Sequence, residues 1–212
     1  MQWIIQIPVL FFSIIVHEFT HGYIAHKKGD DTAYLSGRLT FNPLPHIDLT
    51  GTVLIPAMCI MSGMPVFGWA KPVPVNPLRL RRPRKDMALV ALSGPASNIA
   101  IAFFSLVMFK IVSLSGLASV DLTNTFLMLF RFAVIINLAL AFFNLIPVFP
   151  LDGSQILLGT LPDKWLDVYE KHIPYGMYII LFLMISGILK MLVLPPMIFA
   201  LTIFSKMGFG LM

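Results

Sequence analysis

The chain has 212 residues, of which 58% are hydrophobic and only 12% are charged, and its mean hydropathy is +0.86. Soluble domains carry about 25% charged residues, so this composition excludes an ordinary soluble protein and predicts one integral-membrane domain over residues 1–212. The single cysteine, Cys59, excludes an intramolecular disulfide and a cysteine-rich metal site.

The first apolar run, residues 2–25, is long enough to cross a bilayer as a helix, and it carries His17, Glu18 and His21. It lacks a basic start and a cleavage site, so we expect it to be retained rather than removed as a signal peptide. In a helix the two histidines share one face, and both can bind one metal while Glu18 reaches a water on it. Ionisable groups at membrane depth cost roughly 2.5–3.5 kcal/mol each, so we interpret this H-E-x-x-H pattern as a site for one Zn²⁺.

The segment after this helix has a different pattern of polar and apolar residues. Polar and apolar residues alternate from Tyr34 to Phe41, and Gly37 and Pro43 interrupt the pattern as turn residues do. We therefore expect a short membrane-associated β-hairpin region here. His46 and Asp48 are interpreted as turn caps that hydrogen-bond backbone, not as metal ligands.

Residues 52–68 form a further apolar stretch that either spans the membrane or re-enters it. Basic residues precede it, and the short loop after it carries most of the excess positive charge: Lys71, Arg79, Arg81, Arg82, Arg84 and Lys85. Positive loops face the cytoplasm, so a re-entrant segment, which keeps both flanks on that side, is favoured over a full span. We expect this basic loop to contact lipid headgroups and not nucleic acid.

Three more apolar blocks follow, at residues 87–114, 124–148 and about 175–211. In the last block, Pro195 and Pro196 favour two spans over one kinked helix. We therefore predict an all-α polytopic membrane protein, a bundle of about 5–6 transmembrane helices. Its catalytic core would cover about residues 1–155 and its C-terminal helices about residues 174–212.

A catalytic zinc needs a third protein ligand, and the chain offers few candidates. A metzincin would need glycine and histidine where Ile24 and Lys27 stand. Glu170 lies in a mixed-charge stretch typical of a solvated helix face. Asp152 is different, because the prolines that follow Asn144 must end the preceding helix and allow the chain to fold back toward the bundle. We therefore predict Asp152 as the third ligand.

Several segments together resemble the site-2 protease family of intramembrane zinc metalloproteases, in its compact prokaryotic form without a PDZ domain. They are HEFTH at 17–21, GRLTFNPLPHIDLTG at 37–51, GWAKPVPVNP at 68–77, SGPASN at 93–98 and NLIPVFPLDG at 144–153. The resemblance implies hydrolysis of peptide bonds in or near transmembrane segments of other proteins. It also implies His17, His21 and Asp152 as zinc ligands and Glu18 as the catalytic acid and base. Because no PDZ module is present in this sequence, we expect no dedicated domain for substrate selection.

The resemblance makes Asn144 a candidate hydrogen-bond donor to the developing oxyanion, with interhelical packing as the alternative. Packing is the preferred role for Asn98 and Asn137. If residues 52–68 are re-entrant, the first helix and the 124–148 helix run parallel. The zinc then lies toward the cytoplasmic side of a prokaryotic inner membrane.

Other functions remain open from the sequence. A membrane zinc transporter or sensor would need the ligands but no general base, and a silent adaptor would need neither. For a protease, the strand-like Leu35–Asn42 segment is expected to pair with the unwound substrate. The sequence gives no prediction of the oligomeric state.

Overall fold

A computed structural model describes residues 2–62, 70–114 and 120–209 of the chain. Four helices in this part are long and apolar enough to cross a membrane: α1 (Gln2–Lys27), α4 (Pro83–Leu114), α5 (Val120–Asn144) and α9 (Ile188–Lys206). The all-α polytopic prediction is confirmed, but the number of about 5–6 spans is too high for the described residues. The reason is length: α3 (Ile55–Ser62) has eight residues and α8 (Gly176–Ile185) has ten.

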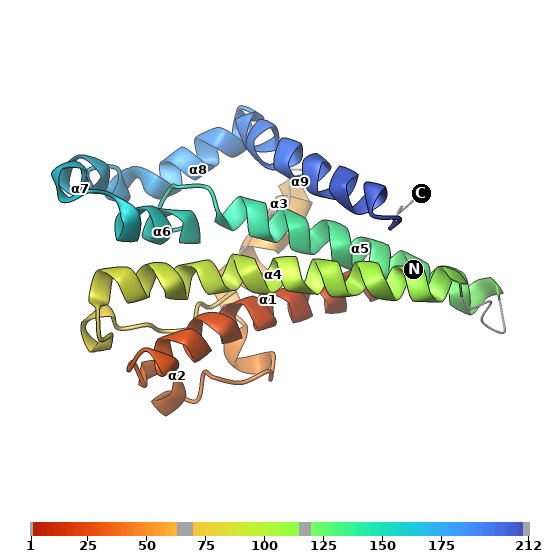
Figure 1. The fold of residues 1–212 in the computed structure, drawn as a ribbon, viewed down its shortest axis with the longest axis horizontal. Coiled ribbons are helices and arrows are strands. Elements are labelled where there is room, and N and C mark those ends of the chain that lie inside the picture. Colours follow the sequence, from red (N-terminus) through yellow and green to blue (C-terminus); the bar gives the residue numbers. More distant parts are fainter. Residues whose placement is uncertain (1, 63–69, 115–119, 210–212) are drawn as a thin grey trace.

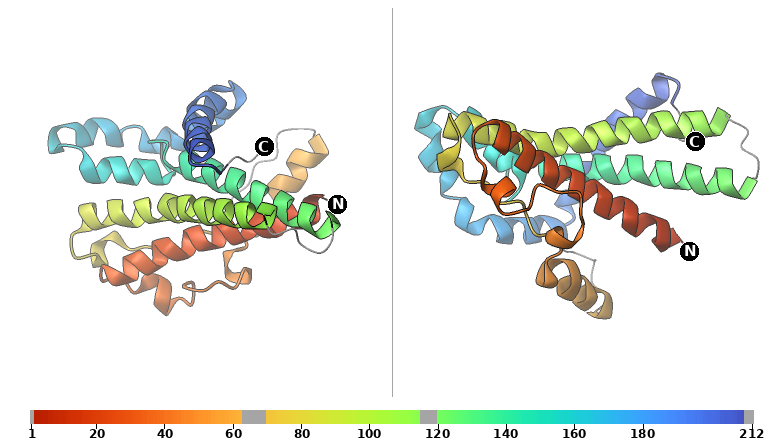
Figure 2. Two further views of the ribbon diagram at one scale, coloured as in Figure 1. Left: turned by 45° about the vertical axis from the view of Figure 1, so that its right-hand side comes forward. Right: turned by 90° about the horizontal axis from the view of Figure 1, so that it is seen from below.

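The centre of the molecule is a layer made by α1, α4 and α5. Figure 1 shows α1 and α5 running in the same direction and α4 running in the opposite direction. The parallel arrangement of α1 and α5 that the sequence predicted is therefore confirmed. A core of Ala102, Leu106, Val134 and Leu138 joins α4 to α5, and α9 packs on its outer side. The left view of Figure 2 shows the same order of helices, and its right view shows α4 and α5 side by side with α1 inclined to them.

Helix α5 ends at Asn144, as the prolines that follow it in the sequence predict. It then turns back and begins α6 (Asp152–Thr160), which packs against α4. Gly153 has no left-handed backbone angle, so freedom of φ is not why glycine stands here. A Cβ at this position would lie 2.3 Å from the carbonyl oxygen of Leu145, so glycine is needed for close approach.

The predicted β-hairpin region is wrong, because no strand occurs in residues 2–62, 70–114 or 120–209. The segment instead forms α2 (Thr32–Leu35), a 3₁₀ turn η1 (Leu44–His46) and a π-helical turn η2 (Leu49–Leu54) before α3. The backbone of the expected first strand is paired locally, since Arg38 N donates to Ala33 O. The burial pattern is also inverted: Leu35 is exposed and Arg38 is buried.

The two ends of the stretch that contains residues 52–68 meet. Lys71 N donates a hydrogen bond to His46 O at 2.9 Å, so the chain leaves and returns at one point. A full span would separate these ends by roughly 30 Å. This closure agrees with the expected re-entrant segment. Residues 63–69, which include the Gly63 and Gly68 positions, lie outside the described part.

The C-terminal third continues through α7 (Asp163–Glu170), the 3₁₀ turn η4 (Ile173–Tyr175), α8 and α9. The break predicted at Pro195 and Pro196 is wrong, because both prolines lie inside α9. The chain turns instead at Gly187, whose φ of +77° is the left-handed conformation that favours glycine at a helix end. The fixed φ of proline is itself helical, so the pair removes hydrogen bonds without ending the helix.

Candidate metal centre

The side chains of His17, His21 and Asp152 converge where α1 meets the first turn of α6. The Nε2 atoms of the two histidines are 3.1 Å apart. Asp152 Oδ2 lies 3.2 Å from His17 Nε2, and Asp152 Oδ1 lies 3.3 Å from His21 Nε2. One ligand atom of each residue lies within 4.8 Å of the other two. The structure thus brings together the three residues that the sequence predicted as metal ligands.

The orientation of both imidazole rings is fixed by their other nitrogen. His17 Nδ1 lies 2.6 Å from Asn98 Oδ1, and His21 Nδ1 lies 2.7 Å from Val90 O. Both partners are oxygens that only accept, so each Nδ1 carries a proton and Nε2 is the ring nitrogen left to bind a metal. Metal-binding histidines are held in this way in proteins generally.

These contacts test whether the group fits a metal. The two imidazole Nε2 atoms and a carboxylate face one another, and both rings are buried. Asp152 Oδ2 is also buried with no hydrogen-bond donor among the described residues. A cation would satisfy all three groups. Two imidazoles and one carboxylate are a donor set that suits Zn²⁺ and leaves a fourth position for water.

The close approach of α4 to this group depends on Gly94, in the middle of the SGPASN segment. A Cβ here would lie 2.5 Å from His21 Nε2 and 2.6 Å from His17 Cε1. Any larger residue would therefore collide with both rings. The sequence motif gave no physical reason for this glycine, and the structure supplies one.

A buried chain of amide and hydroxyl groups continues from His17 across three helices. Asn98 Nδ2 donates to Asn137 Oδ1 at 2.8 Å, and Asn137 Nδ2 donates to Ser13 Oγ at 2.8 Å. The interhelical packing role expected for Asn98 and Asn137 is confirmed. The contact between Asn98 and His17 was missed, because the residues are 81 positions apart and no local pattern links them.

Glu18 and Asn144 lie near this centre in the chain but contact other groups. Glu18 Oε2 accepts a hydrogen bond from Val73 N at 2.8 Å. Asn144 Nδ2 donates to Leu140 O at 3.0 Å, inside its own helix. Neither residue belongs to the group of three ligand atoms.

The remaining candidates behave as turn or surface residues. His46 is buried and its Nε2 lies 3.0 Å from Thr40 O. Asp48 Oδ1 accepts from Gly51 N at 2.6 Å and caps η2, so the turn-capping interpretation of both is confirmed. Glu170 ends the short helix α7, and Cys59 is half-buried in α3.

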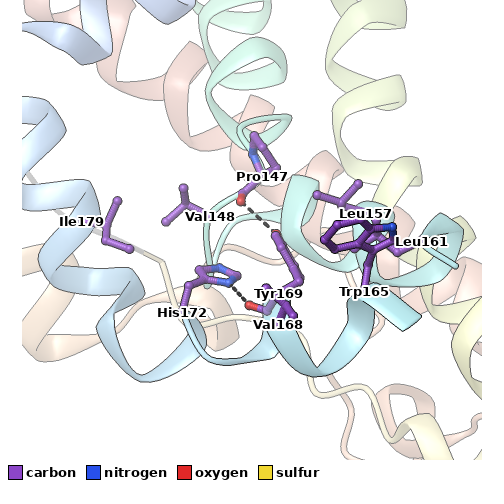
Figure 3. Close-up of a pocket in the computed structure, with 9 residues that line it drawn as sticks. All are labelled: Pro147, Val148, Leu157, Leu161, Trp165, Val168, Tyr169, His172 and Ile179. Carbon is purple, nitrogen blue, oxygen red and sulfur yellow. Dashed lines mark hydrogen bonds between the residues drawn. The ribbon is translucent and has the colours of Figure 1, made fainter. Parts of the chain in front are cut away.

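An apolar pocket of about 480 Å³ lies behind the loop that leads to Asp152 (Figure 3). Two of its lining side chains hold that loop by its backbone. Tyr169 Oη donates to Pro147 O at 2.8 Å, and Phe149 N donates to His172 Nε2 at 3.2 Å. Burial raises the pKa of the Tyr169 phenol, which therefore remains a donor at neutral pH. None of the predicted ligands lines the pocket, but two of its lining side chains hold the loop that precedes Asp152.

Comparison with known proteins adds an independent line of evidence. The sequence profile described as peptidase family M50 matches residues 108–187. The chain is 37% identical over 190 residues to YwhC of Bacillus subtilis, whose name assigns it to the zinc metalloproteases, covering 89% of this chain and 83% of that protein.

Two further relatives also carry zinc metalloprotease names. The one from Methanocaldococcus jannaschii is 22% identical over 191 residues, and this chain spans 44% of its length. Rip2 of Mycolicibacterium smegmatis is 25% identical over 196 residues and is spanned over 69% of its length. Each alignment covers 89% of this chain. No solved structure matches the chain significantly.

Proposed function

Because this chain belongs to peptidase family M50, the family of site-2 proteases, we propose that His17, His21 and Asp152 bind its catalytic zinc. The chain is thus a site-2 protease-like intramembrane zinc metalloprotease, an enzyme that hydrolyses peptide bonds. The observation that carries the ligand assignment is the convergence of two correctly oriented imidazoles and one carboxylate oxygen in a buried site.

The reaction divides between the metal and two side chains. Bound zinc would polarise the scissile carbonyl and lower the pKa of a water molecule to about 7. Glu18 is our proposed general base, which takes the proton from the attacking water and gives it to the leaving amine. Asn144 is our proposed donor to the oxyanion, a role that requires its amide to leave Leu140 O.

We propose transmembrane segments of other proteins as the substrates. The membrane setting supports this, since α1, which carries both histidines, is itself long and apolar enough to span a bilayer. A substrate peptide bond must therefore reach the site at membrane depth. Trapping substrates on Glu18→Gln in native membranes, followed by mass spectrometry, would identify them.

We further propose that the site faces the cytoplasm from a prokaryotic inner membrane. The support is the concentration of basic residues in the loop before α4. Cysteines placed at Ser36 and Asn76, in a Cys59→Ser background, should react with an impermeant thiol reagent only after the inner face is opened. Labelling of Asn76→Cys from outside intact cells would refute this orientation.

The decisive experiment measures zinc and cleavage in the same protein. Glu18→Gln should retain one zinc per chain and lose cleavage of a single-span test protein that the wild type cuts. A zinc transporter, which has no need of a general base, would keep its flux in this variant. Retained cleavage by Glu18→Gln would refute the assignment of the general base.

A further inference from the structure

Two segments of the sequence, GRLTF and KPVPVN, have no role in the chemistry described so far. The second, residues 71–76, is an extended piece of chain that runs beside α1 before α4 begins (Figure 1); we name it the strap. Pro72 and Pro74 have no N–H group, so Val73 carries the one backbone N–H between these two prolines. That donor is directed at Glu18 Oε2, at 2.8 Å.

The strap lies close to α1 because the helix has a glycine beneath it. A Cβ at Gly22 would lie 2.9 Å from Val73 Cγ1 and 3.2 Å from Ala33 Cβ. Val73 itself is buried. The contact between strap and helix is therefore packed tightly on the helical turn that follows Glu18.

The first end of the strap is fixed by Arg38, from the GRLTF segment. Its Nη2 donates to Lys71 O at 2.9 Å and to Pro72 O at 3.2 Å. Arg38 is only 9% exposed and its Nε has no partner among the described residues, so backbone oxygens hold a buried guanidinium. Charged donors make stronger hydrogen bonds than neutral ones, which makes this a firm anchor.

The second end is fixed by Asp30, which is fully buried. Its Oδ2 accepts from Asn76 N at 2.6 Å, and its Oδ1 accepts from Thr32 N at 3.0 Å. Burial acts to raise the pKa of Asp30, but hydrogen bonds from Thr32 and Asn76 hold that pKa below its usual value. Asp30 is therefore a carboxylate at neutral pH and accepts from both backbone groups.

We propose that the strap, anchored by Arg38 and Asp30, positions Glu18 for catalysis through the N–H of Val73. This inference rests on the proposed role of Glu18 as general base. The hydrogen bond occupies Oε2 and fixes the rotation of the carboxylate, so that Oε1 is left to accept the proton of the attacking water. The prolines make the strap rigid because their rings fix the backbone angle φ. This rigidity matters, since a mobile donor would not hold the carboxylate in one orientation. Val73, Arg38 and Asp30 are positioning residues and do not contact the reacting atoms.

The test removes one N–H group from the strap. Val73→Pro should lower kcat at least tenfold on a single-span test protein, with KM within twofold, zinc at one per chain and an unchanged melting temperature. The matched control is Val75→Pro, which adds a proline where the N–H makes no hydrogen bond in the described structure, and it should keep the wild-type kcat. Val73→Ala, which retains the N–H, should be at least five times as active as Val73→Pro.

A second variant keeps the proposal testable if Val73→Pro does not fold. Arg38→Met removes the anchor without touching Glu18, and should also lower kcat more than KM while zinc is retained. Arg38→Lys, which keeps a charged donor, should recover part of the rate. A merely structural role would instead lower zinc content or melting temperature together with kcat. Wild-type kcat in Val73→Pro, beside an inactive Glu18→Gln, would overturn the positioning role and leave the proposed function intact.

Discussion

The contacts that join α1, α4 and α6 differ in kind from those that hold α8 and α9. At the first junction, glycine and hydrogen-bonding side chains meet, as with Gly94 beneath the imidazoles and Asn98 on His17. No residue of α9 is buried, and it contacts the core through apolar side chains such as Leu201 and Phe204. The side-chain hydrogen bonds of residues 176–206 in the described structure stay within their own turns, as for Thr202.

The contacts at the first junction orient particular atoms, whereas those of α8 and α9 only hold helices together. A hydrogen bond fixes the direction of an atom, as the metal site requires, whereas apolar contacts between helices in lipid are weakly directional. Removal of a single atom at the first junction should therefore alter the chemistry. A comparable change in α9 should alter little beyond local packing.

The largest effect should come from Asp152→Ala, which removes a proposed ligand. We expect the protein to lose its zinc and at least about a thousandfold in activity, because the two histidines alone leave the ligand set incomplete. Metal analysis and cleavage of a single-span test protein would measure both. Glu170→Ala is the matched control and should keep zinc and activity. Full zinc in Asp152→Ala would show that the third ligand is elsewhere.

A smaller but still large effect is expected for Gly94→Ala. The added methyl group would lie 2.5 Å from His21 Nε2, so α4 or the rings must shift. Disturbed ligand orientation typically costs 10–100-fold in metal affinity, which a chelator competition would measure. The control is Gly187→Ala, where a Cβ meets nothing within 4 Å and only backbone strain of about 1–2 kcal/mol is expected. Equal zinc affinity in the two variants would contradict the comparison.

The next largest effect on zinc affinity should come from Asn98, whose side-chain amide contacts His17. Asn98→Ala removes the acceptor for His17 Nδ1, and we expect zinc affinity to fall about tenfold. Asn137→Ala cuts the same chain of hydrogen bonds one residue further away, so it should lower thermal stability and change zinc affinity less than threefold. If both variants lose zinc equally, the whole chain orients His17 and not Asn98 alone.

The limits of prediction from the sequence follow the same division. The convergence of His17, His21 and Asp152 was predictable, because helical spacing and a helix ended by prolines are local signals that only a few residues can produce. The contact between Asn98 and His17 and the one between Val73 and Glu18 were not predictable, because each joins distant segments. The β-hairpin failed for a related reason: alternation describes one segment, and the local turns that pair its backbone leave no partner strand.

The break in the C-terminal block was also misplaced, and this leads to the smallest expected effect. Pro195 and Pro196 leave the carbonyls of Met191 and Leu192 without their usual helical donors. Pro196→Ala would restore one donor and stabilise the protein by at most about 1 kcal/mol. Thermal unfolding should show a slight rise in melting temperature, and cleavage should stay within twofold of wild type, because α9 makes no hydrogen bond to the metal centre in the described structure. A tenfold loss of cleavage with zinc retained would mean that flexibility at the prolines serves catalysis, and α9 could then no longer be treated as a helix held by apolar contacts alone.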